Sequence, residues 1–263
     1  MWTDKCAAKQ FLLLRDKFKM DIMMETGTAH GVNAQFYSQY FGRVLSCDNS
    51  IKMVRAARER NAYNNNVFIA LEDSVLFLKR FVVSCKYRTR LTSPVLILLD
   101  AHYTNIPVLE ELKALKGFHN CCVIIHDFKV AGLGHIAYRR QALDLELVYD
   151  ALMKVNPKFK LYHNTRATCM PVTHDDIQHG RLQGLTLDPG VRYVLDYAWG
   201  MDESKRYRGI LYAVPEQLDY GLLYRSFDLE EFSLLEIESA KGNSTRIDNT
   251  GIDNTKLKEA VSL

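Results

Sequence analysis

Short apolar runs alternate with amphipathic stretches along the first half of the chain. Five of these runs have the length and composition of buried strands, and they lie at about 21–24, 43–47, 67–71, 95–99 and 121–125. The stretches between them repeat apolar residues at helical spacing and predict helices at 32–40, 51–61, 75–83 and 107–116, after a first helix at 3–19. Strands that alternate with helices predict an α/β fold of the Rossmann-like, doubly wound type, with a mainly parallel sheet and helices on both faces.

The second half of the chain is less regular. Apolar spacing predicts a helix at 141–154, a strand at 159–162 and a late strand at 209–215, which we expect at an edge of the sheet. Residues 165–207 contain glycines, prolines and charges with few periodic runs. They predict an inserted loop or lid, to which residues 130–140 would contribute.

The pattern as a whole fits one Rossmann-like domain over residues 1–238. A chain of 263 residues with 48% hydrophobic content can build one full core of this size. The remaining residues, 239–263, are polar and repeat the sequence Ile-Asp-Asn-Thr, so we expect a flexible tail there.

The net charge and the cysteine pattern bear on which partners and which cellular compartment can be expected. The net charge of +3 gives no reason to expect nucleic acid or an acidic membrane as a partner. The sequence has no run of 18 apolar residues, and its N-terminus lacks the charged-then-apolar order of a signal peptide. The six cysteines form no CxxC pair, which indicates reduced thiols in a cytoplasmic protein. Neither nucleic acid nor a membrane is therefore expected as a partner, and a homo-oligomer stays open.

An acidic residue stands at the end of each predicted strand of the first half: Glu25, Asp48, Asp73, Asp100 and Asp127. Because parallel strands with right-handed crossovers bring their carboxyl ends to one edge of a sheet, these acids are expected to gather there. Such a set suits a ligand that is cationic or rich in hydroxyl and amino groups.

The first of these acids opens a glycine-bearing turn, Glu25-Thr26-Gly27-Thr28-Ala29-His30-Gly31, between a predicted strand and a predicted helix. Glycine permits the positive φ and the close backbone approach that a tight strand-to-helix turn needs. Asp48, at the end of the next strand, has the position of an acid that holds a ribose diol. The two features together predict a nucleoside site.

These residues resemble the class I S-adenosylmethionine-dependent methyltransferase superfamily over about 20–130, with weaker similarity to 215. The resemblance implies that Glu25 faces the amino-acid end of the ligand, that the two glycines pass under the nucleoside, and that Asp48 takes the ribose hydroxyls. It also implies that the pair after the third strand lies near the adenine. The residues expected to bind adenosylmethionine are Glu25, Gly27, His30, Gly31, Asp48, Asp73 and Ser74.

Two further motifs look most like the branch of macrocin O-methyltransferase and the cephalosporin-hydroxylase-like proteins. They are Leu99-Asp100-Ala101-His102 and Ile125-His126-Asp127. The resemblance implies O-methylation of a small molecule or of a sugar hydroxyl. The sequence contains no Asn/Asp-Pro-Pro-Tyr/Phe motif, so methylation of a nucleobase or of glutamine is not indicated.

The candidate catalytic residues are Asp100, His126 and His102, because imidazole titrates near neutrality and a carboxylate can orient it. Asp100, His126 and Asp127 are also a candidate set of ligands for a divalent metal, magnesium or manganese. Two alternatives therefore stay open beside the methyltransferase. One is a metal-dependent, hydroxylase-like oxidoreductase on the same scaffold, and the other is a methyltransferase-like fold that binds without catalysis.

Overall fold

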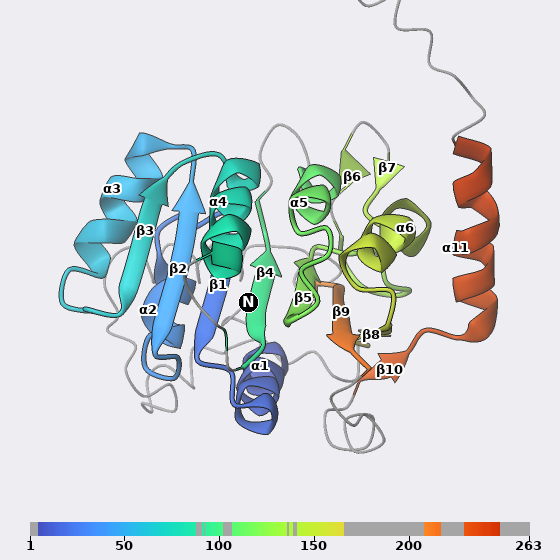
Figure 1. Cartoon of the computed structure of the whole chain (residues 1–263), viewed down its shortest axis with the longest axis horizontal. Coiled ribbons are helices and arrows are strands. Elements are labelled where there is room, and N and C mark those ends of the chain that lie inside the picture. Colours follow the sequence, from blue (N-terminus) through green and yellow to red (C-terminus); the bar gives the residue numbers. More distant parts are fainter. Residues whose placement is uncertain are drawn as a thin grey trace, which may run out of the picture.

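A mixed β-sheet lies between two layers of helices in the computed structural model (Figure 1). The structure describes residues 5–87, 91, 93–101, 107–135, 137–138, 141–165, 208–216 and 229–247. The strands of the sheet are β1 (Ile22–Thr26), β2 (Arg43–Asp48), β3 (Val67–Leu71), β4 (Val95–Leu99), β5 (Cys121–His126), β8 (Phe159–His163), β9 (Ile210–Pro215) and β10 (Glu230–Glu231). Within the described part of the chain their order is β10-β8-β9-β5-β4-β1-β2-β3.

The five strands from β3 to β5 are parallel, while β9 runs antiparallel to both of its neighbours. The predicted Rossmann-like, mainly parallel sheet is thus confirmed. The prediction that 209–215 forms an edge strand is wrong, because β9 lies between β5 and β8. All six residues of β9 are buried, as expected for an apolar run that is covered on both faces.

Helices cover both faces of the sheet. One face carries α1 (Lys5–Phe18) and α2 (Val32–Tyr37), whose aromatic side chains pack on β1, β4 and β9. The other face carries α4 (Ser74–Tyr87), α5 (Val108–Ala114) and α6 (Leu145–Val155). In addition, α3 (Ile51–Arg60) packs against β3. None of the described helices is both long and apolar enough to span a membrane.

The helix expected at 141–154 starts later than predicted. Its first residue is Leu145, and Asp144 caps it by accepting a hydrogen bond from the backbone N–H of Leu147 at 3.2 Å. The two preceding residues form β7 (Gln141–Ala142), which pairs with β6 (Ala137–Tyr138) in a separate ribbon.

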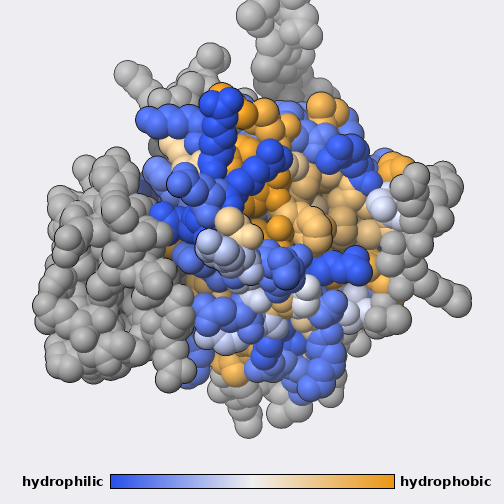
Figure 2. All heavy atoms as spheres, turned by 90° about the vertical axis from the view of Figure 1, so that its left-hand side faces the viewer, coloured by the Kyte–Doolittle hydropathy of each residue, from blue (hydrophilic) through white to orange (hydrophobic). Residues whose placement is uncertain are grey.

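The free edge of the sheet at β3 is partly blocked. The Arg58 side chain donates two hydrogen bonds to the carbonyl oxygen of Ile69, at 3.0 and 2.8 Å, and so occupies an acceptor that another strand would need. Figure 2 shows this side of the molecule, with hydrophobic side chains among hydrophilic ones. The large exposed hydrophobic residues of β3 and α4 are Phe68, Leu71, Leu76 and Val83.

The C-terminal part of the described chain is helical. The flexible tail predicted from residue 239 is wrong at its start, because α11 (Leu234–Ile247) continues past the expected domain end at 238. Its Ala240 is fully buried in the core on the α6 side of the sheet, and Lys241 lies over the ring of Tyr149, 5.9 Å from the centroid. Residues 248–263 lie outside the described part.

Packing of α11 on α6 leads to a prediction. Ala240→Arg places an unpaired charge in a buried contact, so it should lower the free energy of unfolding by about 3 kcal/mol. The matched control, Ser239→Arg, changes an exposed neighbour on the same helix and should have almost no effect. Urea unfolding measures both, and equal midpoints for the two variants would contradict the packing of α11.

Candidate functional site

The glycine-bearing turn leaves the end of β1 with an unusual backbone. Gly27, Ala29 and Gly31 all have positive φ, at 80, 43 and 72°. A Cβ atom at Gly27 would lie 2.5 Å from the carbonyl oxygen of Asp100. Glycine is therefore needed because the ends of β1 and β4 approach each other closely, which is a different reason from the expected passage under a nucleoside.

Asp48, the last residue of β2, supports this turn. Its Oδ2 accepts a hydrogen bond from the backbone N–H of Ala29 at 3.0 Å, and its Oδ1 accepts one from Ser50 at 2.8 Å. The first bond holds Ala29 in its left-handed conformation, which is costly for a residue with a side chain. A carboxylate oxygen has two lone pairs, so each oxygen of Asp48 can accept one more hydrogen bond.

Glu25 lies inside β1 and is only 1% exposed. Its two oxygens accept hydrogen bonds from Asn33 of α2 and from Ser46 of β2, each at 2.8 Å. Burial raises the pKa of Glu25 to about 7, against the opposing effect of these two bonds. The side chain thus ties β1 to α2 and β2. That it faces the amino-acid end of a ligand stays a prediction.

The pair expected near the adenine begins α4. Asp73 caps this helix, since its Oδ1 accepts hydrogen bonds from the N–H groups of Val75 and Leu76 at 3.0 and 3.2 Å. Ser74 is buried at the start of this helix. Sequence reasoning missed Glu111, although its place in the apolar stripe of α5, between Val108 and Leu112, was a signal that it is buried.

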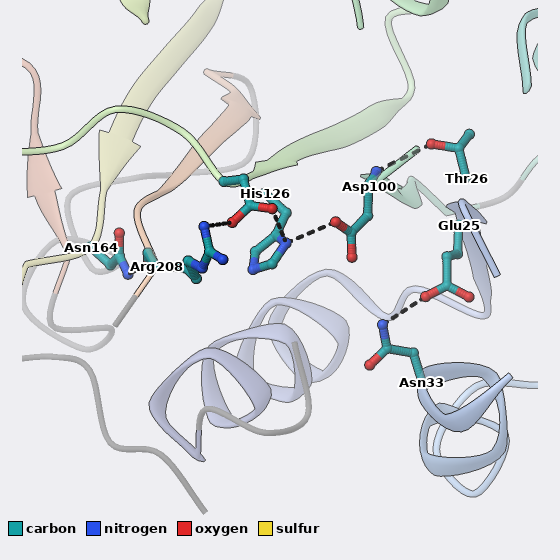
Figure 3. Close-up of polar contacts among 8 residues, drawn as sticks. Glu25, Thr26, Asn33, Asp100, His126, Asn164 and Arg208 are labelled. Carbon is teal, nitrogen blue, oxygen red and sulfur yellow. Dashed lines mark hydrogen bonds and ion pairs between the residues drawn. The ribbon is translucent and has the colours of Figure 1, made fainter. Parts of the chain in front are cut away.

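Asp100 and His126 form a hydrogen-bonded pair at the ends of β4 and β5 (Figure 3). Nδ1 of His126 lies 2.8 Å from Oδ1 of Asp100, and the side chains of His126 and Asp100 are 16% and 15% exposed. Burial lowers the pKa of His126, but the charges of Asp100 and Asp127 outweigh this effect and leave the pKa raised. The pair therefore unites two residues that the sequence analysis had placed together at one edge of the sheet.

Asp127 joins this pair because the backbone turns at the end of β5. Neighbouring residues of a strand point to opposite faces, but Asp127 has left the strand and adopts a left-handed φ of 56°. Its Oδ2 comes to 3.6 Å from Nδ1 of His126. On its other side, Oδ1 forms an ion pair with Nη1 of Arg208 at 3.0 Å.

Arg208 and Asn164 were not predicted as site residues. Asn164 is 2% exposed and donates from Nδ2 to the carbonyl oxygen of Arg208 at 2.8 Å, while its Oδ1 accepts from the N–H of Ile210 at 2.7 Å. It thereby fixes the end of β8 to the start of β9. The only signal for these two residues was their position next to the irregular segment 165–207, most of which lies outside the described residues.

The predicted metal ligands do converge. Asp100, His126 and Asp127 each offer one ligand atom, and these atoms lie within 4.8 Å of one another. His102, the third catalytic candidate, lies outside the described residues. His30 is in the glycine-bearing turn, where its carbonyl oxygen accepts a hydrogen bond from Nε of Arg60 at 2.8 Å.

Without the separate β6–β7 ribbon and β10, the sheet order counted along the chain is 3-2-1-4-5-7-6, which is typical of the class I methyltransferase fold. No family model and no curated protein matches the sequence. Many solved structures are similar to this chain, and three methyltransferases among them, all of low identity, are described below.

The first is the plantazolicin methyltransferase BamL, at 12% identity, with 80% of this chain and 84% of that chain covered and a TM-score of 0.47. The second is phosphoethanolamine N-methyltransferase 1 of Haemonchus contortus, at 12% identity, 93% and 47% coverage and a TM-score of 0.43. The third is magnesium protoporphyrin IX methyltransferase of Synechocystis PCC 6803, at 14% identity, 80% and 78% coverage and a TM-score of 0.41. Values this low say nothing about what this chain binds or transforms.

The two buried glutamates predict how stability depends on pH. Burial raises the pKa of Glu25 and of Glu111 from 4.5 to about 7 in the folded state. Stability is therefore highest below pH 4.5, where both groups are protonated in the folded and unfolded states, and it falls as the pH rises through 7 because each buried group must then ionise. A shift of this size corresponds to roughly 3 kcal/mol for each group.

Glu25→Gln removes one of these titrations. Urea midpoints of the wild type should fall between pH 5 and pH 8, and the fall should be clearly smaller in Glu25→Gln. Glu59→Gln, an exposed change on α3, serves as the control and should keep the wild-type slope. Identical slopes for all three proteins would show that Glu25 is already ionised in the folded state at pH 5.

Proposed function

We propose that this chain is an S-adenosylmethionine-dependent methyltransferase that methylates a hydroxyl group of a small molecule or sugar. The observation that carries the proposal is the arrangement at the carboxyl edge of the sheet. The glycine-bearing turn and Asp48 stand at β1 and β2, and the bonded pair of Asp100 and His126 stands at the adjacent strands β4 and β5. A donor half and an acceptor half thus lie side by side.

The donor half has the chemistry that adenosylmethionine requires. Its ribose needs hydrogen-bond acceptors, and Asp48 retains accepting capacity on both oxygens. Its sulfonium and ammonium charges need negative partners, and the carboxyl groups of Asp48, Asp73 and Asp100 end or follow the strands β2, β3 and β4 of this edge. The residues present therefore fit this ligand, and we infer that Asp48 and the start of α4 at Asp73 and Ser74 hold its nucleoside.

The acceptor half can remove a proton. A carboxylate only accepts hydrogen bonds, so the bond between Asp100 and His126 places the proton on Nδ1 of the neutral imidazole. Nε2 then presents its lone pair, and it has no hydrogen-bond partner among the residues that the structure describes. We infer that Nε2 takes the proton of the acceptor hydroxyl, while Asp100 orients the ring and stabilises the resulting imidazolium.

Adenosylmethionine would supply an electrophilic methyl group when bound. The protein contributes alignment of the acceptor oxygen and a base at the right place, because methyl transfer needs an in-line approach. The resemblance of the motifs around Asp100 and His126 to the macrocin O-methyltransferase branch supports an oxygen acceptor.

A metal-dependent reaction is the second candidate, and the convergence of Asp100, His126 and Asp127 favours it. Two contacts oppose it. Nδ1 of His126 already engages Asp100, and Arg208 places a positive charge 3.0 Å from Asp127. A dication at this point would have to compete with that guanidinium, so we favour the metal-free base.

Calorimetry tests the donor half. The wild type should bind adenosylmethionine and adenosylhomocysteine, and Asp48→Asn should weaken both by about tenfold or more, because one charged acceptor for the ribose and the turn is lost. Glu146→Gln, an exposed change on α6, is the control. No binding to the wild type, or binding of NADH in its place, would contradict the proposal.

Transfer of a labelled methyl group into a fractionated metabolite extract tests the acceptor half. His126→Ala should lower the rate about 10²–10⁴-fold, while His119→Ala, an exposed change at the other end of β5, should not. The wild-type rate should rise with pH through a midpoint above that of free histidine, and Asp100→Asn should move this midpoint to lower pH.

Chelation separates the candidates in the same assay. EDTA should leave the wild-type rate unchanged if His126 acts as a metal-free base. Loss of the rate with EDTA and its return with magnesium or manganese would establish the metal site, and iron in the purified protein would favour the oxidoreductase. Bound adenosylmethionine without methyl transfer to any fraction would favour a non-catalytic binding module.

A further inference from the structure

We propose that the hollow between α4 and the first residues of β1, β2 and β3 is a second binding site, for an amphipathic molecule with an apolar chain and a carboxylate head that Arg43 holds. This site lies toward the edge of the sheet opposite to the glycine-bearing turn. The proposal therefore goes beyond the proposed function and does not depend on it.

One wall of the hollow is a face of the sheet. Ile22 of β1 pairs in register with Arg43 of β2, and Leu45 of β2 pairs with Phe68 of β3. Side chains alternate between the two faces along a strand, while residues paired across parallel strands share a face. Because Ile22 and Leu45 pack toward the α4 side, all four side chains lie on that face.

The other wall comes from α4. Phe81, Ser84 and Cys85 have the spacing of one helix face and line the hollow, together with Leu91 beyond the helix. Burial raises the pKa of the Cys85 thiol, so this side chain is neutral and adds to the apolar lining. The hollow has a volume of about 270 Å³. An apolar cavity of about 150 Å³ already holds benzene, so this one has room for an apolar chain of roughly ten carbons.

The path of α4 leaves the hollow partly uncovered. This helix leads from β3 to β4, and the strand order places β2 and β1 between them, so the connection crosses the sheet. Phe68, which lines the hollow, is 54% exposed as a result. Figure 2 shows hydrophobic side chains gathered on this side of the molecule with hydrophilic ones around them. A bound apolar chain would remove part of this surface from water, which is favourable.

The charge of Arg43 selects the head group of the ligand. Arg43 is exposed at the start of β2, and its guanidinium has no hydrogen bond or ion pair with any residue that the structure describes. Arg80 of α4 is by contrast paired with Glu72 at 2.7 Å. No carboxyl group is among the described residues that line the hollow. An unpaired guanidinium favours an anion, and its planar fork fits a carboxylate through two parallel hydrogen bonds.

The hollow is separate from the site proposed for methyl transfer. Ile22 and Arg43 are the first residues of β1 and β2, whereas Asp48 and the glycine-bearing turn stand at the other ends of these strands. Strands of this length place the two ends roughly 15 Å apart. A molecule in the hollow and a molecule at the turn can therefore be bound at the same time.

Decanoate is the probe, because it carries a carboxylate on an apolar chain of the expected length, and calorimetry measures its binding to the full chain. Decanol offers the chain without the charge. Arg43→Gln removes the cation, Arg43→Lys keeps it, and Arg55→Gln on α3 is an exposed control. Phe68→Ser removes part of the apolar wall. Leu76→Ser is its matched control, because Leu76 is also 54% exposed and does not line the hollow.

The wild type should bind one decanoate per chain. Arg43→Gln should weaken decanoate about fivefold or more without changing the affinity for decanol, while Arg43→Lys should stay within about threefold of the wild type. Phe68→Ser should weaken both probes about tenfold, because an apolar contact is lost. Arg55→Gln and Leu76→Ser should match the wild type, and saturating adenosylhomocysteine should leave the decanoate affinity unchanged.

Alkylation of Cys85 is a second measurement, and it needs no variant. Cys85 and Cys6 are the two partly exposed thiols among the described cysteines, but Cys6 belongs to α1 and does not line the hollow. Decanoate at about ten times its Kd should slow the labelling of Cys85 by iodoacetamide about tenfold. The labelling of Cys6 should stay the same, and mass spectrometry of the labelled peptides measures both rates.

Unchanged decanoate affinity in Phe68→Ser, or equal labelling of Cys85 with and without decanoate, would overturn the site. Equal decanoate affinity of the wild type and Arg43→Gln would overturn the carboxylate head. Displacement of decanoate by adenosylhomocysteine would place the probe at the other edge of the sheet and also overturn the proposal. A wild-type dimer that Phe68→Ser dissociates, without decanoate binding, would show that a second copy of this chain covers the hollow instead.

Discussion

The close approach of two strand ends sets the geometry of the whole site. No side chain fits between the end of β1 and the end of β4, because a Cβ at Gly27 would lie 2.5 Å from the carbonyl oxygen of Asp100. Gly27 has a φ of 80°, which side chains disfavour, so both space and conformation demand glycine. This contact brings the glycine-bearing turn beside Asp100, the residue that orients His126.

Buried hydrogen bonds keep this contact in register. Glu25 joins β1 to β2 and α2, and Oγ1 of Thr26 joins β1 to the end of β4 by accepting a hydrogen bond from the N–H of Asp100 at 3.2 Å. Glu25 and Glu111 of α5 are the two buried glutamates of the fold's described part. Both carboxyl groups have raised pKa values because they are buried, so near neutral pH each is close to half-protonated. Stability is given up at the place where the site needs fixed strand ends, which is common where a site requires polar groups in a low-dielectric interior.

Much of the fold follows from periodicity alone. The five parallel strands and their helices were predicted because buried runs such as Val95–Leu99 and amphipathic runs such as Ile51–Arg60 have distinct periods. The interior place of β9 could not be predicted, because strand order depends on long-range pairing with β5 and β8. The helix α11 was missed because its polar sequence is compatible with a tail, and its contact with the rest of the protein is seen only in the burial of Ala240 and the place of Lys241 over Tyr149.

The sequence predicted the parts of the site that depend only on the order of the strands along the chain. Acids that follow parallel strands must share an edge, so Asp100, His126 and Asp127 were expected to meet, and they do. The partners from distant parts of the chain, such as Arg208 and Asn164, carry no local pattern that marks them. The sequence also could not show why position 27 must be glycine, because it does not reveal which backbone atom lies against that residue.

A crystal structure of the protein with adenosylhomocysteine tests the central claim most directly. The ribose hydroxyls should lie within hydrogen-bond distance of the Asp48 carboxylate, and the sulfur should face the gap toward Nε2 of His126. The turn from Gly27 to Gly31 should keep its backbone conformation. A ligand bound elsewhere, or one whose sulfur lies on the side of the sheet away from His126, would contradict the account.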